Sequence, residues 1–328
     1  MQRIFGLVRD KAEKLLADGT VDRVIGWKRG EFFYDQTPAV FSAEEGLGGL
    51  VYDEFCASNL SKYLIRESRK DGKILALLKP CDTYGFNQLM KEHRIRRENV
   101  YVLGIGCDGM LDINKIRGKG IKGIEKIEAK GDQLVIQTIY GEKTCGRGEV
   151  LLDKCLCCKG KKHMVYDELL TAEDELPMPK ANRFEQVEKL EAMTPDERFA
   201  FWRGELSKCI RCNACRDICP VCTCEKCIFD NERSGIASKA NTDSFEENMF
   251  HIIRAFHVAG RCTDCGECSR VCPQKIPLHL LNRKFIKDIN RFYGEFQAGA
   301  DAEARGPLTD FTKDDVEPGT AANGGGNL

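Results

Sequence analysis

The sequence predicts an α/β amino-terminal domain, with a mixed sheet and flanking helices, followed by a smaller, mainly helical domain. Two observations support this division. In residues 1–172, apolar runs of strand length alternate with stretches of helical periodicity. Eleven of the 18 cysteines then fall between Cys209 and Cys272. We expect a linker over residues 173–204, the cysteine-rich domain over 205–296 and a flexible tail over 297–328, which is rich in glycine and alanine.

The amino-terminal elements follow from the spacing of apolar residues. Helical spacing from Gln2 to Leu16 predicts a first helix, and Val21–Trp27 reads as a strand. Lys73–Leu78 and Val100–Ile105 are further apolar runs, separated by helical periodicity over residues 84–93. The order strand, helix, strand predicts a parallel crossover.

Four further segments complete the expected fold. A helix is predicted from Leu50 to about Glu67, and alternation over residues 121–140 predicts a hairpin that decorates the sheet. Residues 244–258 and 278–292 are amphipathic, so helices should flank the second group of cysteines. The proline-interrupted linker suits one or two short helices.

Composition excludes several classes of protein. Lysine plus arginine (50) and aspartate plus glutamate (51) nearly cancel, which gives no support to binding of nucleic acid through net charge. No run of about eighteen apolar residues predicts a membrane span, and the first residues do not form a signal peptide. We therefore expect a cytoplasmic protein, in which clustered cysteines indicate metal ligation or thiol chemistry rather than disulfides.

Two stretches repeat one spacing, in which three cysteines lie three residues apart and a fourth, followed by proline, lies four residues further on. The first is Cys209, Cys212, Cys215 and Cys219, and the second is Cys262, Cys265, Cys268 and Cys272. This is the pattern of bacterial two-cluster ferredoxins, whose fourth cysteine ligates the other cluster. It predicts two 4Fe-4S clusters, one held by Cys209, Cys212, Cys215 and Cys272 and the other by Cys262, Cys265, Cys268 and Cys219. Zinc also binds thiolates, but zinc modules pair cysteines without the longer step.

A long amphipathic helix separates the two motifs. In this the region resembles the helical two-cluster ferredoxin domains of succinate dehydrogenase and heterodisulfide reductase type subunits. Three more cysteines, Cys222, Cys224 and Cys227, directly follow the first motif. We interpret them as ligands of an additional cluster, completed by Cys56, Cys145 or Cys157; the alternative is that they are spare thiols beside the ferredoxin.

Cysteines also follow the predicted amino-terminal strands, in Lys79-Pro-Cys-Asp82, Gly104-Ile-Gly-Cys-Asp-Gly109 and Cys155-Leu-Cys-Cys158. These three segments resemble those of the beta-subunit family of deazaflavin-coenzyme hydrogenases and dehydrogenases, over about residues 38–170. The resemblance implies a third 4Fe-4S cluster near a flavin, with the ligands Cys81, Cys107, Cys155 and Cys158. It also implies that Gly46, Gly48 and Gly49 stand where the family contributes to flavin binding.

Other motifs yield no site. Gly104, Gly106 and Gly109 match a dinucleotide fingerprint, but Gly118 and Gly120 leave no room for the long helix that would bind the pyrophosphate. No Walker loop and no arrangement of serine, histidine and acid stands out, so no catalytic residue is assigned.

The leading hypothesis is an electron-transfer subunit of an anaerobic multi-subunit oxidoreductase of formate dehydrogenase, hydrogenase or heterodisulfide reductase type. Its 4Fe-4S clusters would relay single electrons between partner subunits. The second hypothesis is an FAD-containing subunit that exchanges hydride with a deazaflavin or nicotinamide coenzyme and passes electrons to the clusters. The third, from another class, is a zinc-stabilised interaction module.

Overall fold

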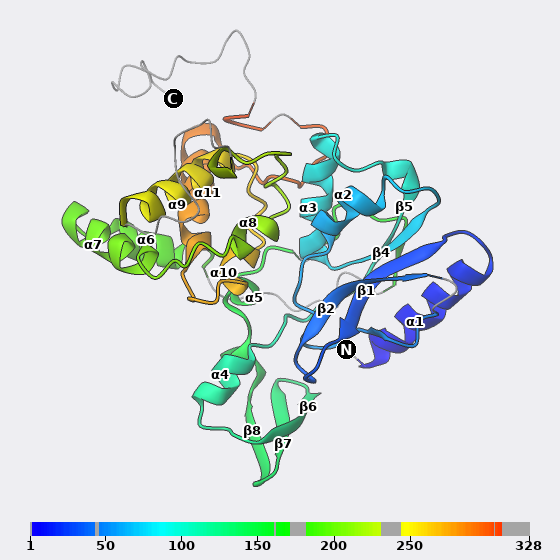
Figure 1. Cartoon of the computed structure of the whole chain (residues 1–328). Coiled ribbons are helices and arrows are strands. Elements are labelled where there is room, and N and C mark those ends of the chain that lie inside the picture. The colour runs from blue at the N-terminus through cyan, green and yellow to red at the C-terminus, as the bar shows by residue number, and fades with distance from the viewer. Residues whose placement is uncertain are drawn as a thin grey trace.

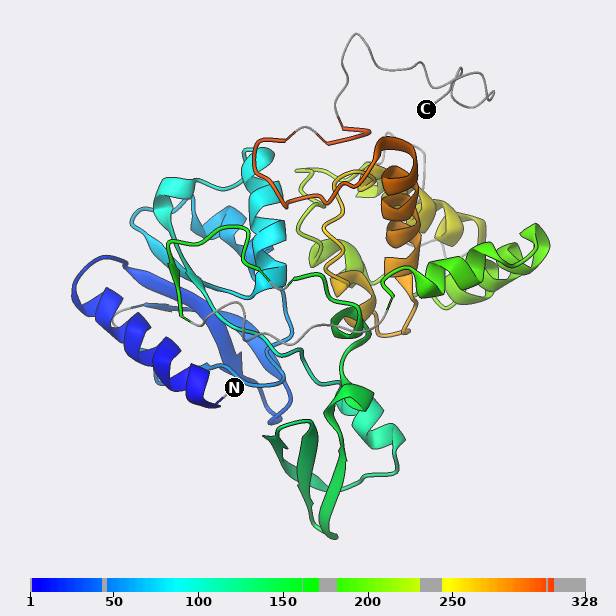
Figure 2. The same cartoon turned by 180° about the vertical axis from the view of Figure 1, so that it is seen from behind.

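A computed structural model describes residues 2–42, 46–160, 162–170, 182–230, 244–304 and 306–309. An amino-terminal half built on a β-sheet and a helical carboxyl-terminal half lie side by side, and a small second sheet projects below their junction (Figures 1 and 2). The predicted division into an α/β part and a mainly helical part is confirmed. No helix in the described ranges is long and apolar enough to cross a membrane.

The main sheet is mixed, as predicted. Its strands run in the order β2-β1-β4-β5-β9, and β3 pairs with β1. They are β1 (Arg23–Arg29), β2 (Gln36–Ser42), β3 (Leu50–Val51), β4 (Ile74–Leu78), β5 (Val100–Gly104) and β9 (Glu168–Leu169). The pairs β1–β4, β4–β5 and β5–β9 are parallel, whereas β2 and β3 run antiparallel to β1. The expected parallel crossover is therefore present between β4 and β5.

The helices of this half are α1 (Gln2–Ala17), η1 (Ser61–Tyr63), α2 (Leu64–Glu67), α3 (Pro80–Lys91) and η2 (Arg97–Asn99). The first predicted helix is confirmed, and its buried Val8, Ala12 and Leu15 join the core formed by the sheet. The predicted helix over residues 50–67 is wrong over most of its length. Leu50 and Val51 pair with β1 instead, and helical structure begins only at Ser61.

The predicted hairpin is confirmed as β6 (Ile124–Lys130) and β7 (Gln133–Thr138), but it does not extend the main sheet. It forms a separate three-stranded sheet with β8 (Gly141–Gly146), and its own core includes Leu134, Ile136 and Val150. The short helices α4 (Ile113–Gly118), η3 (Arg147–Val150) and α5 (Asp153–Leu156) border it. The helix that follows Gly109, α4, starts at Ile113 and is only six residues long, as expected from the glycines that argue against a long dinucleotide-binding helix.

The carboxyl-terminal half consists of α6 (Glu185–Glu191), α7 (Pro195–Leu206), α8 (Ala214–Asp217), η5 (Ile228–Asp230), α9 (Ser244–His257), α10 (Glu267–Arg270) and α11 (Leu278–Tyr293). The two predicted amphipathic helices are α9 and α11. Thr194 and Glu197 form a reciprocal capping box at the start of α7, where Pro195 occupies the first turn.

Two expected connecting segments are packed where the structure describes them. Val187 and Leu190 of α6, inside the predicted linker, form a small core with Leu280 of α11. Ala298, in the predicted tail, is buried, and Asn87 donates a hydrogen bond of 3.2 Å to the carbonyl of Gly299. The first residues of the predicted tail therefore pack against α3. Residues 173–181 and 310–328 lie outside the described ranges.

Candidate metal centres

The two cysteine motifs of the helical half share one backbone course. Arg211 and Asn213 in the first motif, and Asp264 and Gly266 at the matching positions of the second, all have φ between 52° and 68°. These left-handed residues turn each loop around its cysteines before the short helices α8 and α10 begin. The repeat seen in the sequence is thus a repeat of structure.

The first centre combines residues from both motifs. Cys209, Cys212 and Cys215 line one pocket together with Cys272, which belongs to the second motif. Cys215 is buried on α8, whereas Cys212 is exposed. The structure therefore brings together the four cysteines that the sequence grouped across a separation of more than fifty residues. We call this pocket site A.

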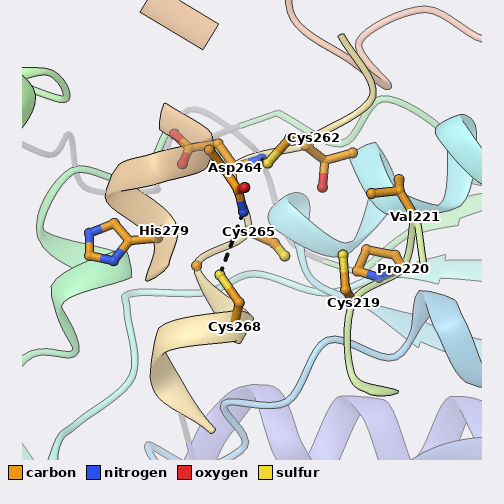
Figure 3. A pocket seen from close by; sticks show the side chains of 11 residues that line it. Cys219, Pro220, Val221, Cys262, Asp264, Cys265, Cys268 and His279 are labelled. Carbon is orange, nitrogen blue, oxygen red and sulfur yellow. Dashed lines mark hydrogen bonds between the residues drawn. The ribbon is translucent and has the colours of Figure 1, made fainter. Parts of the chain in front are cut away.

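The second centre likewise combines three cysteines of one motif with the fourth cysteine of the other. Cys219, from the end of the first motif, lines a pocket with Cys262, Cys265 and Cys268. Figure 3 shows Cys219 reaching in beside Cys265 and Cys268. We call this pocket site B. The chain passes from one site to the other at the cysteine–proline steps, which explains the longer fourth interval in each motif.

The surroundings of both sites suit a sulfur-ligated cluster. The backbone N–H of Arg211 donates to Cys209 Sγ, and that of Asp264 donates to Cys262 Sγ, each at 3.4 Å. Asn282 Nδ2 donates to Cys268 Sγ at 3.8 Å. Donors around the cysteines stabilise the charge that a cluster and its thiolates carry.

Buried polar groups also face these pockets without a protein partner. In the part of the chain that the structure describes, both ring nitrogens of His251 and two guanidinium nitrogens of Arg211 have none, and both residues line site A. Thr263 Oγ1 is likewise without a partner at site B. Since buried donors are rarely left unsatisfied, these groups fit a bound acceptor such as the sulfide of a cluster.

A buried cation lies between the two sites. Arg254 of α9 is only 5% exposed and donates a hydrogen bond of 2.8 Å to the carbonyl of Cys215. Burial alone would lower the pKa of Arg254, but the surrounding cysteines, Cys219 first among them, hold it above its usual value. Burial, with Arg254 and Arg211, lowers the pKa of His251 to about 3, so its imidazole is neutral near pH 7.

A third group of cysteines lies at one edge of the main sheet. Cys81 is in the first turn of α3, directly after β4, and Cys107 follows β5. Because the two strands are parallel and Leu78 pairs with Gly104, their carboxyl ends lie together. Cys155 lies on α5 and Cys158 follows two residues after its end. Burial first, and to a smaller extent the neighbouring thiols of this group, raise the pKa of Cys81, Cys107 and Cys158. We call this group site C.

Local structure at site C also fits a thiolate-ligated group. The N–H of Met110 donates to Cys155 Sγ at 3.4 Å, and that of Gly160 donates to Cys158 Sγ at 3.3 Å. A Cβ on Gly160 would come within 2.8 Å of the Cys81 backbone nitrogen, so only glycine allows the two segments to approach this closely.

A buried lysine supports the same site. Lys79 is 1% exposed; its Nζ lies 3.1 Å from Asp82 and 4.0 Å from the centre of the Trp27 ring. It also donates to the carbonyl of Ser58 at 2.9 Å. Burial raises the pKa of the Cys81 and Cys107 thiols, and the charge of Lys79 opposes this rise in both.

Site C is bound directly to the loop of site B. Lys154, next to Cys155, forms a buried ion pair with Glu267, and a Cβ on Gly266 would approach Lys154 Cβ to 2.5 Å. Lys159, next to Cys158, donates to the carbonyl of Thr263. Burial raises the pKa of the Glu267 carboxyl, but Arg270 and Lys154 outweigh it and hold that pKa well below its usual range. Sites B and C are therefore neighbours in a packed interior.

The three additional cysteines line another cavity, but no remote cysteine joins them there. Cys222, Cys224 and Cys227 share this cavity with cationic side chains. The expectation that a remote cysteine completes the group is not met, because the three candidates are engaged elsewhere: Cys56 is fully buried beside Asp53, Cys145 lies on β8, and Cys157 accepts a hydrogen bond of 3.2 Å from Arg283.

The glycines proposed for flavin lie between β2 and β3. A Cβ on Gly46 or Gly48 would meet no atom within 4 Å, so both border open space, whereas one on Gly49 would approach Phe41 at 3.5 Å. A strand follows them, where a helix was predicted. The sequence analysis did not identify Arg254, His251, Lys154 or Lys159 as neighbours of these sites. The only signal available was that Lys154 and Lys159 are adjacent to Cys155 and Cys158 in the sequence.

Comparison with known proteins supports both halves of the chain. A family model described as a 4Fe-4S dicluster domain matches residues 205–276, the region of sites A and B. This match confirms the prediction of 4Fe-4S clusters in the carboxyl-terminal half.

Two relatives align with most of the chain. A protein from Methanocaldococcus jannaschii named F420-dependent formate dehydrogenase subunit beta is 24% identical over 339 residues, covering 86% of this chain and 89% of that protein. A protein from Methanococcus maripaludis named F420-dependent formate dehydrogenase 1 subunit beta is 25% identical, covering 91% and 92%. They confirm the resemblance to beta subunits of deazaflavin enzymes. A chain of the F420-reducing [NiFe] hydrogenase complex from Methanosarcina barkeri matches over 47% of this chain at 15% identity, with a TM-score of 0.36.

Proposed function

We propose that this relative of F420-dependent formate dehydrogenase beta subunits is an iron-sulfur electron-transfer subunit of a multi-subunit oxidoreductase, with three 4Fe-4S clusters in one chain. The observation that carries the proposal is the contact of the three cysteine sites. Site A and site B exchange their fourth cysteines, and site B adjoins site C through Lys154 and Glu267.

The proposed ligands are twelve cysteines. Site A uses Cys209, Cys212, Cys215 and Cys272; site B uses Cys262, Cys265, Cys268 and Cys219; site C uses Cys81, Cys107, Cys155 and Cys158. The first two sets are supported by their shared pockets, and the third by the adjacent carboxyl ends of β4 and β5 and the close approach of Gly160 to Cys81. Thiolate-only ligation with N–H donors to sulfur is typical of 4Fe-4S clusters.

Each cluster, when bound, takes up and releases one electron. The chain's own residues set the conditions for that exchange. Buried Arg254 and Lys79 place positive charge beside the sites and so favour the reduced, more negative form. The buried pair Lys154–Glu267 joins site C to the loop of site B.

The order of the sites suggests where partners dock. Site A has an exposed ligand in Cys212, and the neighbouring Ile210 is 57% exposed, so site A is closest to the surface on the helical half. Site C lies at the edge of the main sheet. We therefore propose that electrons pass between a donor near site C and a partner subunit near site A, in the order C, B, A or the reverse.

A reductive titration tests this function. Protein purified without oxygen should take up about three electrons per chain from dithionite, one for each cluster. All of them should return to a one-electron acceptor such as cytochrome c, because the sites communicate. Uptake of two electrons or fewer would remove site C from the account.

The second candidate is an FAD-containing subunit, and the names of the relatives favour it. F420 is a deazaflavin, and carriers of this kind exchange hydride, which a flavin can divide into single electrons. The open space beside Gly46 and Gly48 is compatible with a ligand, although it does not identify one. One FAD per chain after gentle purification would support this candidate; the cytoplasmic location predicted from the sequence is common to both.

A further inference from the structure

The cavity that holds the three additional cysteines has features that cluster ligation does not use. Its volume is about 350 Å³, and its walls carry Cys222, Cys224 and Cys227 together with Lys62, Arg216, Arg254 and Arg261. The sequence element Cys224-Glu-Lys-Cys227 has the two-residue spacing of redox-active dithiols. The cavity is therefore a distinct thiol site, beside site B rather than part of it.

The two cysteines of this element differ in a way that suits thiol chemistry. Cys224 is exposed, whereas Cys227 is half-buried and lines the cavity together with Arg216. Arg216 is itself fixed by Asp230, at 2.7 Å. The cavity lining includes the acids Asp217, Glu225 and Asp230 beside its four cations. An accessible attacking thiol followed by a sheltered partner with cations nearby is the arrangement of reactive cysteine pairs.

The remaining thiol connects this pair to site B. The backbone N–H of Cys222 donates to the carbonyl of Cys219, the proposed site B ligand, at 3.2 Å. Lys62 fixes the same turn by donating to the carbonyls of Arg216 and Cys222, each at 3.1 Å. Cys222 therefore lies between the cluster and the pair Cys224–Cys227.

We propose that Cys224 and Cys227 form a reversible redox-active disulfide that reduces disulfide substrates with electrons from site B. The Cys224 thiolate attacks the substrate disulfide, one substrate thiolate leaves, and Cys227 displaces the second and closes the Cys224–Cys227 disulfide. Two electrons, taken one at a time from the reduced cluster, and two protons from water then break that bond and restore both thiols. The net reaction converts one disulfide, two electrons and two protons into two thiols.

Formation of the disulfide can be tested without relying on the clusters. The full chain, purified without oxygen, is exposed to oxidised glutathione, alkylated under denaturing conditions and digested with trypsin. Because Lys226 lies between the two cysteines, their tryptic peptides should stay joined only through the disulfide. Oxidation should reduce the number of alkylated cysteines by two. Cys224→Ser or Cys227→Ser should abolish the link between the two peptides. The control Cys145→Ser, which replaces a free cysteine on β8, should leave the link intact.

Reduction by the cluster rests on the proposed function and is measured separately. Wild-type protein is reduced with dithionite, freed of excess reductant and mixed with oxidised glutathione or with insulin, and it should release thiols from one of them. Release from glutathione identifies a small disulfide as the substrate, and release from insulin identifies a protein disulfide. Cys222→Ser should slow this reaction at least tenfold while the disulfide still forms. The thiol pair would be overturned if oxidation left the number of alkylated cysteines unchanged, or if the Cys224→Ser variant lost iron. A protein that forms the disulfide normally but contains no iron would instead overturn the proposed clusters.

Discussion

Lys154 and Glu267, 113 positions apart in the sequence, form a buried ion pair that joins site C to the loop of site B. Lys154 precedes Cys155, and Glu267 precedes Cys268. Glu267 is fully buried and also accepts from Arg270 at 2.8 Å and, more weakly, from the N–H of Asn59 at 3.3 Å. The α/β half and the ferredoxin-like half are thus held together at the point where electrons would cross.

Replacement of Glu267 by glutamine should destabilise the protein. It leaves Lys154, in the interior, and the partly exposed Arg270 without a countercharge. Removing one partner of a buried ion pair costs about 3–5 kcal/mol in the free energy of unfolding. Chemical denaturation of matched preparations measures this change. Glu149→Gln is the control, because Glu149 pairs with Lys119 on the surface and should contribute less than about 1 kcal/mol. Equal effects from the two substitutions would contradict a special role for the buried pair.

The exchange of fourth cysteines predicts a pattern in double variants. Cys272→Ser and Cys209→Ser should each remove the site A cluster, so the double variant loses only about four irons. Cys272→Ser combined with Cys262→Ser disrupts two sites and should lose about eight. Iron analysis of protein purified without oxygen compares the two. The reverse pattern would show that each motif keeps its own fourth cysteine.

Site C makes an independent prediction. Cys107→Ser should remove about four irons while the ferredoxin-type signals of sites A and B persist in electron paramagnetic resonance spectra. The matched control is Cys56→Ser, since Cys56 is a buried cysteine of the same half and is not a proposed ligand. Iron content and spectra that match those of the control would refute the assignment of site C.

Arg254 should raise the reduction potentials of both ferredoxin-type clusters. Its buried charge lies among cysteines of site A and site B, and an added electron is stabilised by a nearby cation. Arg254→Met should therefore shift both potentials downward by tens of millivolts, on the order expected for one charge at an effective dielectric constant of about 20. Arg254→Lys should retain most of the effect. A spectroscopic redox titration measures the two reduction potentials in each variant. Potentials in the Arg254→Met variant equal to those of the wild type would contradict this role of Arg254.

The cysteine spacing predicted which cysteines line a common pocket, and the apolar pattern predicted the fold class but not every element. The spacing within Cys209–Cys219 and within Cys262–Cys272 involves only a few consecutive residues. Such a spacing determines the geometry of the ligand loop, so it can be recognised in the sequence alone. The position of Leu50 and Val51 was missed because pairing with β1 overrides helical periodicity in a segment only two residues long. The ion pair between Lys154 and Glu267 could not be predicted from the sequence, because no feature of the residues around either one indicates a contact with a residue 113 positions away.

The three additional cysteines show the same limit. Their closeness in the sequence was plain, but the choice between an additional cluster and spare thiols depended on whether Cys56, Cys145 or Cys157 lies within reach. Hydrogen bonds to Cys56 and Cys157, and the strand pairing of Cys145, fix those residues elsewhere. This information is three-dimensional and is absent from the spacing.

The most direct test of the account is the content of iron, acid-labile sulfide and zinc per chain in protein purified without oxygen. Three 4Fe-4S clusters predict about twelve irons and about twelve sulfides per chain, with no stoichiometric zinc. A content of about eight irons would leave only the ferredoxin-type pair and remove site C. Zinc in stoichiometric amount without iron would contradict the electron-transfer function altogether.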